Sequence, residues 1–215
     1  LHEGEQAIIF LNRRGFSPIV QCQQCGWSPK CPNCDVSLTY HKNTSSLVCH
    51  YCGYSYHMPN ECPDCKNPEL KDAGAGTEKI EDIIADEFPS ARIARMDLDT
   101  THTRNAYERI ISDFSAGKTN LLIGTQMVTK GLDFDNVRVV GILNADTMLN
   151  QPDFRAYEHS FAMMTQVAGR AGRKNKQGQV ILQTSLPQLP VIKHIVNNDF
   201  EAFFSSLMKE REAFH

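Results

Sequence analysis

The chain has 215 residues, a formal net charge of −3 and a pI of about 6.2. Its hydrophobic and charged contents, 41% and 22%, are ordinary for a globular protein of one domain with or without an insert. This charge excludes a global basic field, so nucleic-acid binding would have to rest on local patches. Because no apolar run is long enough for a membrane span or signal peptide, we expect a soluble, intracellular protein. Since it starts at Leu1 and ends within a helical pattern, we expect a piece of a longer chain.

The first predicted element is a short strand at residues 7–12, a continuous apolar run of the kind found in strands buried on both faces. Arg13 and Arg14 follow it directly. A basic pair at the end of a buried strand is a candidate phosphate contact. Two solvated arginines in a turn would fit the same residues equally well.

All eight cysteines lie between residues 22 and 65, in four Cys-x-x-Cys pairs. A disulfide framework would rarely use one spacing throughout, so the pattern predicts structural metal: two tetrahedral Cys₄ zinc sites, with rubredoxin-like iron as an alternative. Three pairings are possible. We favour nesting, because the segment between the second and third pairs has the length of a zinc-ribbon hairpin. The outer site would be Cys22, Cys25, Cys62 and Cys65, and the inner site Cys31, Cys34, Cys49 and Cys52.

Sites with four thiolates leave no coordination position for water, so a catalytic zinc is not expected. Aromatic and basic residues such as Trp27, Tyr54 and Lys42 lie among the cysteines. They could stack on bases or dock a partner. A miniature core around the metals is the simpler explanation for most of the aromatic residues, and the histidines are surplus to eight thiolates.

After the insert, helices and strands alternate, as in an α/β fold with a parallel sheet. Thr77 is a candidate N-cap for a first helix that ends before Pro89. A second helix contains residues 107–114 and is closed by Gly117. The other predicted elements are strands at 91–96, 121–124, 137–143 and 180–184, a helix from about Ala156, and a last helical stretch that follows Pro187 and Pro190.

Two segments resemble phosphate loops without meeting their requirements. Gly117-Lys118-Thr119 ends a helix and begins a strand, whereas a P-loop runs from strand to helix. Gly74–Lys79 lacks the spacing, and the acidic pair Asp86-Glu87 falls late in a helix rather than at a strand end. The chain therefore lacks the groups that grip the β- and γ-phosphates and magnesium.

The loop after the strand at 121–124 is polar and begins where ligands of open α/β sheets gather. Thr125, Gln126 and Lys130 can donate to a nucleic-acid backbone, and Asp133 can accept from a ribose hydroxyl. A plain connection of the same length is the alternative.

The helix from Ala156 is expected to continue to Arg173, with Gln166, Arg170 and Arg173 on one face. Two guanidinium groups and an amide on one face suit a phosphate or carboxylate. Gly169 and Gly172 cost helix stability, so we expect a close backbone approach there. A solvated arginine face at the end of a surface helix remains the alternative.

Together these segments resemble a known family. GTQMVTKGLDF and QVAGRAGR are similar to motifs V and VI of superfamily-2 helicases, and AIIFLNRRGF is similar to motif IV. The cysteine insert, with GAGTEKIEDII, ARMDLDTT and LNQPDFRAYEHSFAMM, narrows the resemblance to the bacterial replication-restart helicases. It runs nearly end to end.

The resemblance implies a RecA-like, parallel-sheet α/β lobe, the C-terminal lobe of the helicase, at residues 1–21 and 67–186. It implies a small double-zinc, ribbon-like module inserted at 22–66, and the start of a C-terminal domain at 187–215. It also implies ATP-driven 3′→5′ unwinding of DNA at stalled forks and assembly of the primosome. The implied partners are forked DNA, primosome proteins and single-stranded-DNA-binding protein, in the bacterial cytoplasm at the nucleoid.

The resemblance also assigns roles to residues. Arg173 and Arg170 match the catalytic arginines of motif VI, with Arg173 as the arginine finger. The residues that match the ATP site are Gln166, Asp133 and Gly131, and those near DNA are Thr125, Gln126, Lys130, Arg13 and Arg14. ATP and Mg²⁺ would be held mainly by an upstream lobe, so the isolated piece should hydrolyse no ATP. The alternative is a zinc-ribbon adaptor that binds nucleic acid or protein without ATPase activity.

Overall fold

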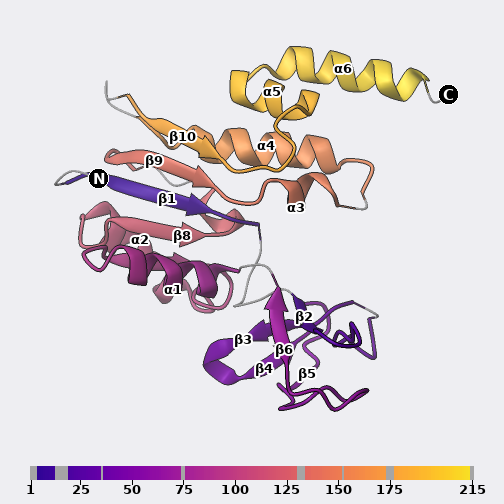
Figure 1. Cartoon of the computed structure of the whole chain (residues 1–215). Helices are drawn as coiled ribbons and strands as arrows, with labels where there is room; N and C mark the ends of the chain where they lie inside the picture. The colour runs from indigo at the N-terminus through magenta and orange to yellow at the C-terminus, as the bar shows by residue number, and fades with distance from the viewer. Residues whose placement is uncertain are drawn as a thin grey trace. The chain divides into compact units, whose positions relative to one another are not determined.

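The computed structural model describes residues 4–12, 19–34, 36–73, 76–129, 134–151, 153–172 and 177–213. The chain forms two compact units, one made of Leu1–Asn12 with Val128–His215 and the other of Arg13–Met127. Figure 1 labels the elements of both units. Over the ranges described, no helix has the length and apolar character that a membrane crossing needs.

The first unit is built on parallel strands. Strand β9 (Val137–Ile142) pairs with β1 (Gln6–Phe10) on one side and with β10 (Gln179–Leu182) on the other. The apolar run that predicted a buried strand does form β1, in which Ile8 and Phe10 are fully buried. Parallel pairing and burial follow together, because helices cover the faces of such sheets.

The described part of this unit has four helices: α3 (Asp146–Leu149), α4 (Ala156–Ala168), α5 (Pro190–Asn197) and α6 (Phe200–Ala213). Phe161 of α4 stacks on Phe203 of α6, with ring centroids 4.5 Å apart. The last helical stretch that the sequence predicted forms two helices, α5 and α6. The left-handed Asn198 (φ 51°) ends the first of them.

The expectation for the end of α4 was wrong. The helix stops at Ala168, and Arg170 lies in the following turn rather than on a helical face with Gln166. The two glycines also differ. Gly169 has an ordinary φ of −64°, whereas Gly172 has a φ of +74° and its backbone lies against Gly178.

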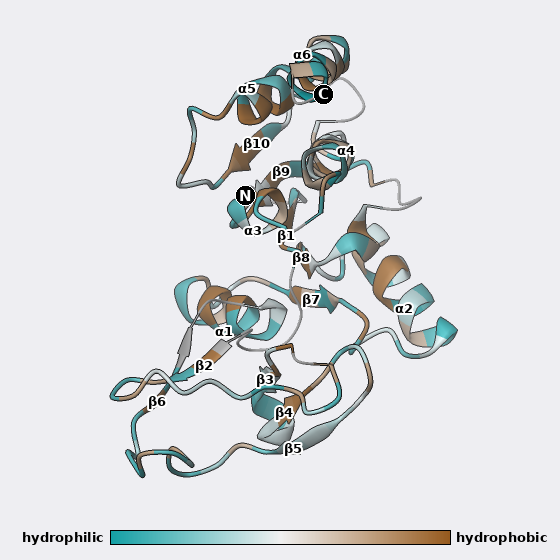
Figure 2. Ribbon diagram, turned by 90° about the vertical axis from the view of Figure 1, so that its right-hand side faces the viewer, coloured by the Kyte–Doolittle hydropathy of each residue, from teal (hydrophilic) through white to brown (hydrophobic). Residues whose placement is uncertain are grey.

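The second unit holds two parallel strands, β7 (Ile93–Met96) and β8 (Leu121–Gly124), and two helices, α1 (Thr77–Glu87) and α2 (Arg104–Ser115). Figure 2 shows hydrophobic and hydrophilic residues on different sides of α1 and α2, as expected for amphipathic helices. Gly117 has a φ of +72° just after α2, as its predicted role in closing that helix requires.

The N-cap of α1 was also predicted wrongly. Gly76 occupies that position, and Thr77 is the first helical residue. The Thr77 hydroxyl instead donates to the Asp97 carboxylate at 2.5 Å, and the pair is buried. A tertiary contact therefore replaces the local cap that the sequence suggested.

The cysteine-rich segment belongs to the same unit. Its ends pair as the antiparallel strands β2 (Ile19–Cys22) and β6 (Leu70–Ala73). Between them lies a three-stranded antiparallel sheet of β3 (Thr39–His41), β4 (Ser46–Val48) and β5 (Ser55–His57), with the turn η1 (Lys42–Thr44) at the hairpin tip. A short turn, η2 (Gln126–Val128), follows β8.

A small core supports this sheet. Val20, Leu38 and Leu47 are fully buried together with cysteines, and Tyr40 and Tyr56 pack against them. Tyr51, by contrast, is 82% exposed. The miniature core therefore accounts for some of the aromatic residues and not for Tyr51.

The close approach of Gly178 gives a stability prediction. A Cβ on Gly178 would lie 2.3 Å from the Gly172 nitrogen and 2.5 Å from the Ala171 carbonyl carbon, and backbone atoms cannot move aside as side chains do. We expect Gly178→Ala to lower the free energy of unfolding by about 1–3 kcal/mol in denaturant titration. Gly169→Ala is the matched control, because its Cβ would come no closer than 3.5 Å to the Thr165 oxygen. Equal effects of the two changes would contradict this account.

Candidate metal centres and motif residues

Three of the Cys-x-x-Cys pairs form the same backbone turn, and the Cys31 N–H makes the first of its bonds, to the Val36 carbonyl at 2.8 Å. In the first pair, the Cys22 N–H donates to the Trp27 carbonyl at 2.8 Å, and the Gly26 N–H donates back to the Cys22 carbonyl at 3.0 Å. The turns that begin at Cys49 and Cys62 repeat both bonds at 2.8 and 2.9 Å. These bonds hold the two thiols of a pair on one side of the turn, where they can bind one metal.

The residue after the second cysteine of these turns is left-handed. Gly26 and Gly53 have φ values of 75° and 77°, and Lys66 has a φ of 62° in the equivalent place. Glycine adopts this conformation without strain, whereas lysine does so at a cost. The equivalent residue of the remaining pair, Asp35, lies outside the described residues.

The sulfur atoms gather in two groups, which are the sets expected from nesting: Cys22, Cys25, Cys62 and Cys65, and Cys31, Cys34, Cys49 and Cys52. Within each group the ligand atoms lie within 4.8 Å of one another. The Cys22–Cys65 and Cys31–Cys52 sulfurs are 3.6 and 3.5 Å apart. A disulfide needs about 2.05 Å, whereas a tetrahedral zinc with Zn–S bonds of about 2.3 Å separates its sulfurs by about 3.8 Å. Both groups therefore have the spacing of a Cys₄ metal site.

The first cysteine of every pair is buried, and the second is more exposed. In the inner group, the buried Cys31 and Cys49 belong to the small core, so a metal there would lie between that core and solvent. The donor set is soft and complete, which suits zinc in a structural role and leaves no position for water. Such a metal would supply folding free energy to an insert with few buried apolar side chains.

The protonation of the thiols fits this interpretation. A hydrogen bond from the Cys25 backbone lowers the pKa of Cys22 to about 6, and one from Tyr54 lowers the pKa of Cys52 to about 6. The hydrogen bond with Cys52 raises the pKa of Cys34 to about 12. Thiolates this close repel one another, so a bound dication is needed to hold all four ionised.

Arg170 is the described arginine of the motif VI segment. Its Nη2 donates to the Thr129 carbonyl at 2.6 Å, which joins the turn after α4 to the residues after η2. Gln166 is exposed on α4. In the second unit, Thr125 is buried and its N–H donates to the Met96 carbonyl at 3.3 Å, while Gln126 is exposed in η2.

The other predicted site residues lie outside the described residues: Arg13, Arg14, Lys130, Gly131, Asp133 and Arg173. Their roles stay predictions. One set of interacting side chains was missed in the sequence, namely Glu78, Arg95 and Asp97 of the second unit. An arginine in the middle of an apolar strand was the available signal, because a buried charge needs partners.

Two family models match the chain. The helicase conserved C-terminal domain matches residues 75–175, and the Cys-rich region domain of the PriA DNA helicase matches residues 31–56. The first match extends from the N-terminus of α1 past the turn that holds Arg170. The second contains the four cysteines of the inner group. The class is therefore a helicase C-terminal domain with a cysteine-rich insert.

Relatives narrow the class. The chain is 47% identical to the replication restart protein PriA of Bacillus subtilis over 209 residues, which cover 97% of this chain and 26% of that protein. It is 41% identical to PriA of Haemophilus influenzae, with coverage of 99% and 29%. The chain belongs to the PriA family of DNA helicases and spans between a quarter and a third of the length of these relatives.

Among solved structures, Saccharomyces cerevisiae Dbp5 bound to RNA and ADP BeF3 aligns with 91% of this chain and 32% of its own. The TM-score is 0.42 and the identity is 16%. A likeness this weak carries no argument about function.

The pKa values predict that metal binding depends on pH. In the metal-free protein at pH 7, Cys34 keeps its proton, and burial raises the pKa of Cys31 as well. Zinc binds thiolates, so its binding must release these protons and its affinity must rise with pH, about tenfold per pH unit for each proton released. Zinc titration of the metal-free protein with a pH indicator measures the release. Equal affinity at pH 6 and pH 8 without proton release would contradict the assignment.

The left-handed residues predict opposite effects of two substitutions. A Cβ on Gly53 would meet no atom within 4 Å, so the cost of Gly53→Ala comes from φ alone, about 1–2 kcal/mol. Lys66→Gly should stabilise, because it relieves the same strain. Both are measured as the free energy of unfolding at saturating zinc. Destabilisation by Lys66→Gly would show that this turn is not strained.

Proposed function

We propose that the chain is the C-terminal lobe and zinc insert of an ATP-dependent 3′→5′ DNA helicase that remodels stalled replication forks and directs primosome assembly. The observation that carries this is the helicase C-terminal domain match, which ends just after Arg170 and Arg173. The contact of Arg170 with Thr129 supports it, because it brings the motif V and motif VI segments together. The chain's share of its relatives' length means that the complete activity needs the remaining polypeptide.

In this proposal the chain supplies one half of the ATP site. Arg173, and with it Arg170, would stabilise the negative charge that develops on the transferring phosphoryl group. Gln166, Gly131 and Asp133 would line the nucleotide. The P-loop and the main magnesium ligands would come from an upstream lobe.

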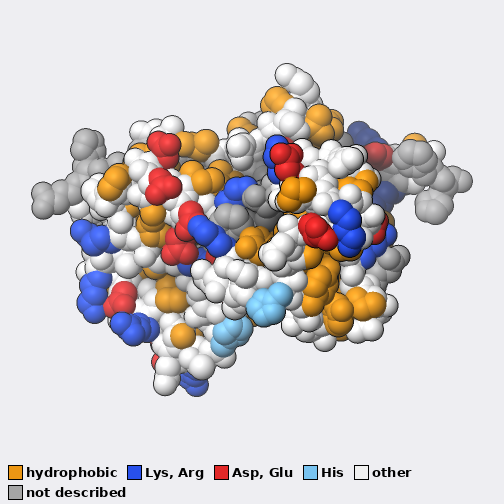
Figure 3. All heavy atoms as spheres, turned by 60° about the horizontal axis from the view of Figure 1, so that its bottom comes forward, with side chains coloured by type: hydrophobic (Ala, Val, Ile, Leu, Met, Phe, Trp, Pro, Cys, Tyr) orange, Lys and Arg blue, Asp and Glu red, His pale blue; other side chains and the backbone are white. Residues whose placement is uncertain are grey.

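The metals in this proposal are two zinc ions, one in each cysteine group, with a structural role. DNA would follow the loop after β8, where Thr125 and Gln126 lie, with further contacts from Lys130, Arg13 and Arg14. On the face shown in Figure 3, basic and acidic side chains are interspersed. DNA binding on this face would therefore rest on a few positioned groups. Primosome proteins and single-stranded-DNA-binding protein would join at the fork in the bacterial cytoplasm.

An arginine substitution in the full-length protein tests the ATP half-site. We expect Arg173→Ala to lower DNA-stimulated ATP hydrolysis by about 10³-fold or more, because an arginine finger acts on the transition state. DNA affinity should change little. Arg155→Ala is the control, since Arg155 is an exposed arginine that lies over the Phe154 ring.

Near-normal hydrolysis by Arg173→Ala would refute the arginine-finger role. If the full-length wild type bound DNA but showed no DNA-stimulated hydrolysis, the zinc-ribbon adaptor would be the better function. The exposed Tyr51, between Cys49 and Cys52, is the feature that favours a binding surface of that kind.

A further inference from the structure

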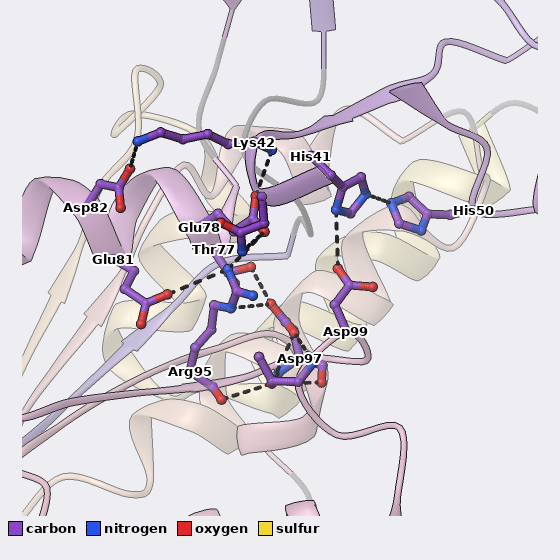
Figure 4. A network of polar contacts seen from close by, with 12 residues as sticks. His41, Lys42, His50, Thr77, Glu78, Glu81, Asp82, Arg95, Asp97 and Asp99 are labelled. Carbon is purple, nitrogen blue, oxygen red and sulfur yellow. Dashed lines mark hydrogen bonds and ion pairs between the residues drawn. The ribbon is translucent and has the colours of Figure 1, made fainter. Parts of the chain in front are cut away.

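Among the described residues, the cysteine-rich insert is attached to the rest of its unit at its neck and along its β3–β4 hairpin. At the neck, β2 and β6 pair. The tip of the hairpin reaches the first turn of α1. There the Lys42 backbone N–H donates to Glu78 Oε2 at 3.3 Å (Figure 4). Asn43 Nδ2 donates to Glu78 Oε1 at 3.1 Å. The Glu78 carboxylate therefore accepts hydrogen bonds from two adjacent residues of the tip.

Glu78 is buried, and so are the charges beside it. Its side chain is 8% exposed, and Arg95 Nη1 lies 3.4 Å from its Oε1. Arg95 Nε lies 3.3 Å from the fully buried Asp97 carboxylate. Neither arginine nitrogen has hydrogen-bond geometry. The hydrogen bonds described for Glu78 therefore both come from the hairpin tip. Loss of these bonds would leave a buried carboxylate without them, which would strongly destabilise the folded protein.

The contacts of these side chains extend to the loop after β8. Asp97 accepts from the Thr100 backbone N–H at 2.9 Å, and the turn that begins there brings the Thr101 hydroxyl 3.1 Å from Met127 Sδ. Thr125, two residues earlier in that loop, is bonded to the backbone of β7. A continuous series of contacts thus leads from the hairpin tip to the loop.

The hairpin tip is also tied to the inner cysteine group by covalent connection. The hairpin lies between Cys34 and Cys49, so a metal bound by both cysteines would hold the two ends of the hairpin segment together. A second contact follows the same route: the His50 ring, next to Cys49, is 3.2 Å from His41, and His41 Nδ1 is 3.8 Å from Asp99 (Figure 4).

We propose that Glu78 is a positioning residue that couples metal binding in the inner cysteine group to α1, β7 and the loop at residues 125–127. Metal holds the hairpin, the hairpin satisfies the Glu78 carboxylate, and Glu78 holds α1 against Arg95. Coupling of this kind is reciprocal in binding free energy, so Glu78 also strengthens metal binding, and we expect this as slower metal loss. One part of this proposal rests on the proposed function, namely that the loop contacts DNA.

Metal release from the full-length protein to a chelating dye tests the coupling. We expect Glu78→Gln to speed release of one of the two metals about tenfold, equivalent to ~1.4 kcal/mol and within the range for residues of one polar network. The other metal, held beside the β2–β6 neck, should leave at the wild-type rate. Asn43→Ala, on the exposed tip, should speed the same metal without touching the buried charges.

Glu81→Gln is the matched control. Glu81 lies on α1 and pairs with Arg95 at 3.6 Å, but its described contacts do not include the hairpin. It should release both metals at the wild-type rates. If Glu78→Gln and Asn43→Ala release metal no faster than Glu81→Gln, the proposal is overturned.

Hydrogen exchange supplies a readout that a purely local role of Glu78 would not move. In the wild type, metal removal should raise amide exchange in α1, β7 and residues 121–128 as well as in the insert. In Glu78→Gln, metal removal should change the insert and leave the exchange of α1 and β7 nearly unaltered. If metal removal leaves the amide exchange of α1 unchanged in the wild type, the coupling is overturned. If metal removal changes amide exchange but leaves the DNA affinity of the protein unchanged, the coupling holds and the role of the loop in DNA binding is refuted.

Discussion

The insert depends on one electrostatic constraint, the repulsion among four thiolates placed within 4.8 Å of one another. Backbone N–H groups relieve it at Cys22 and Cys52, whose pKa values fall to about 6, but not at Cys34, whose pKa rises to about 12. The turns that bring the sulfurs together are made by backbone hydrogen bonds and do not need the charge to be neutralised. The preformed turns let a dication bind all four sulfurs without rearranging the backbone, once the protons that the raised pKa values retain are displaced.

This constraint extends past the insert because the insert is closed at both ends. The β2–β6 ladder fixes its neck, and Glu78 fixes the hairpin tip. A module held at its neck alone could fluctuate independently, whereas one held at both places shares its stability with α1 and β7. The clustering of residues 13–127 into one compact unit agrees with such sharing. The predicted domain limits at 21/22 and 66/67 differ from this division and stay predictions.

The sequence was informative wherever a local rule acts alone. Four equal Cys-x-x-Cys spacings predicted the two sulfur groups, and the apolar run at 121–124 predicted β8 with its observed bounds. It failed where a distant residue decides the conformation. Thr77 has the chemistry of an N-cap, yet its hydroxyl bonds Asp97, twenty residues away. Helical periodicity past Ala168 could not reveal that Gly172 would turn left-handed against Gly178. The arginines beyond α4 therefore could not be placed from spacing.

That failure changes how the motif VI arginines must be understood. A helix would fix their spacing by its own hydrogen bonds, whereas a turn positions Arg170 through tertiary contacts such as that with the Thr129 carbonyl. The Gly172 N–H donates to the Val137 carbonyl at the start of β9, so the turn is tied to the sheet as well as to the residues after η2. A guanidinium placed by tertiary contacts can move when those contacts move, and one placed by a helix cannot. In the proposed helicase, a shift of Thr129 would thereby move Arg170 without any rearrangement of α4.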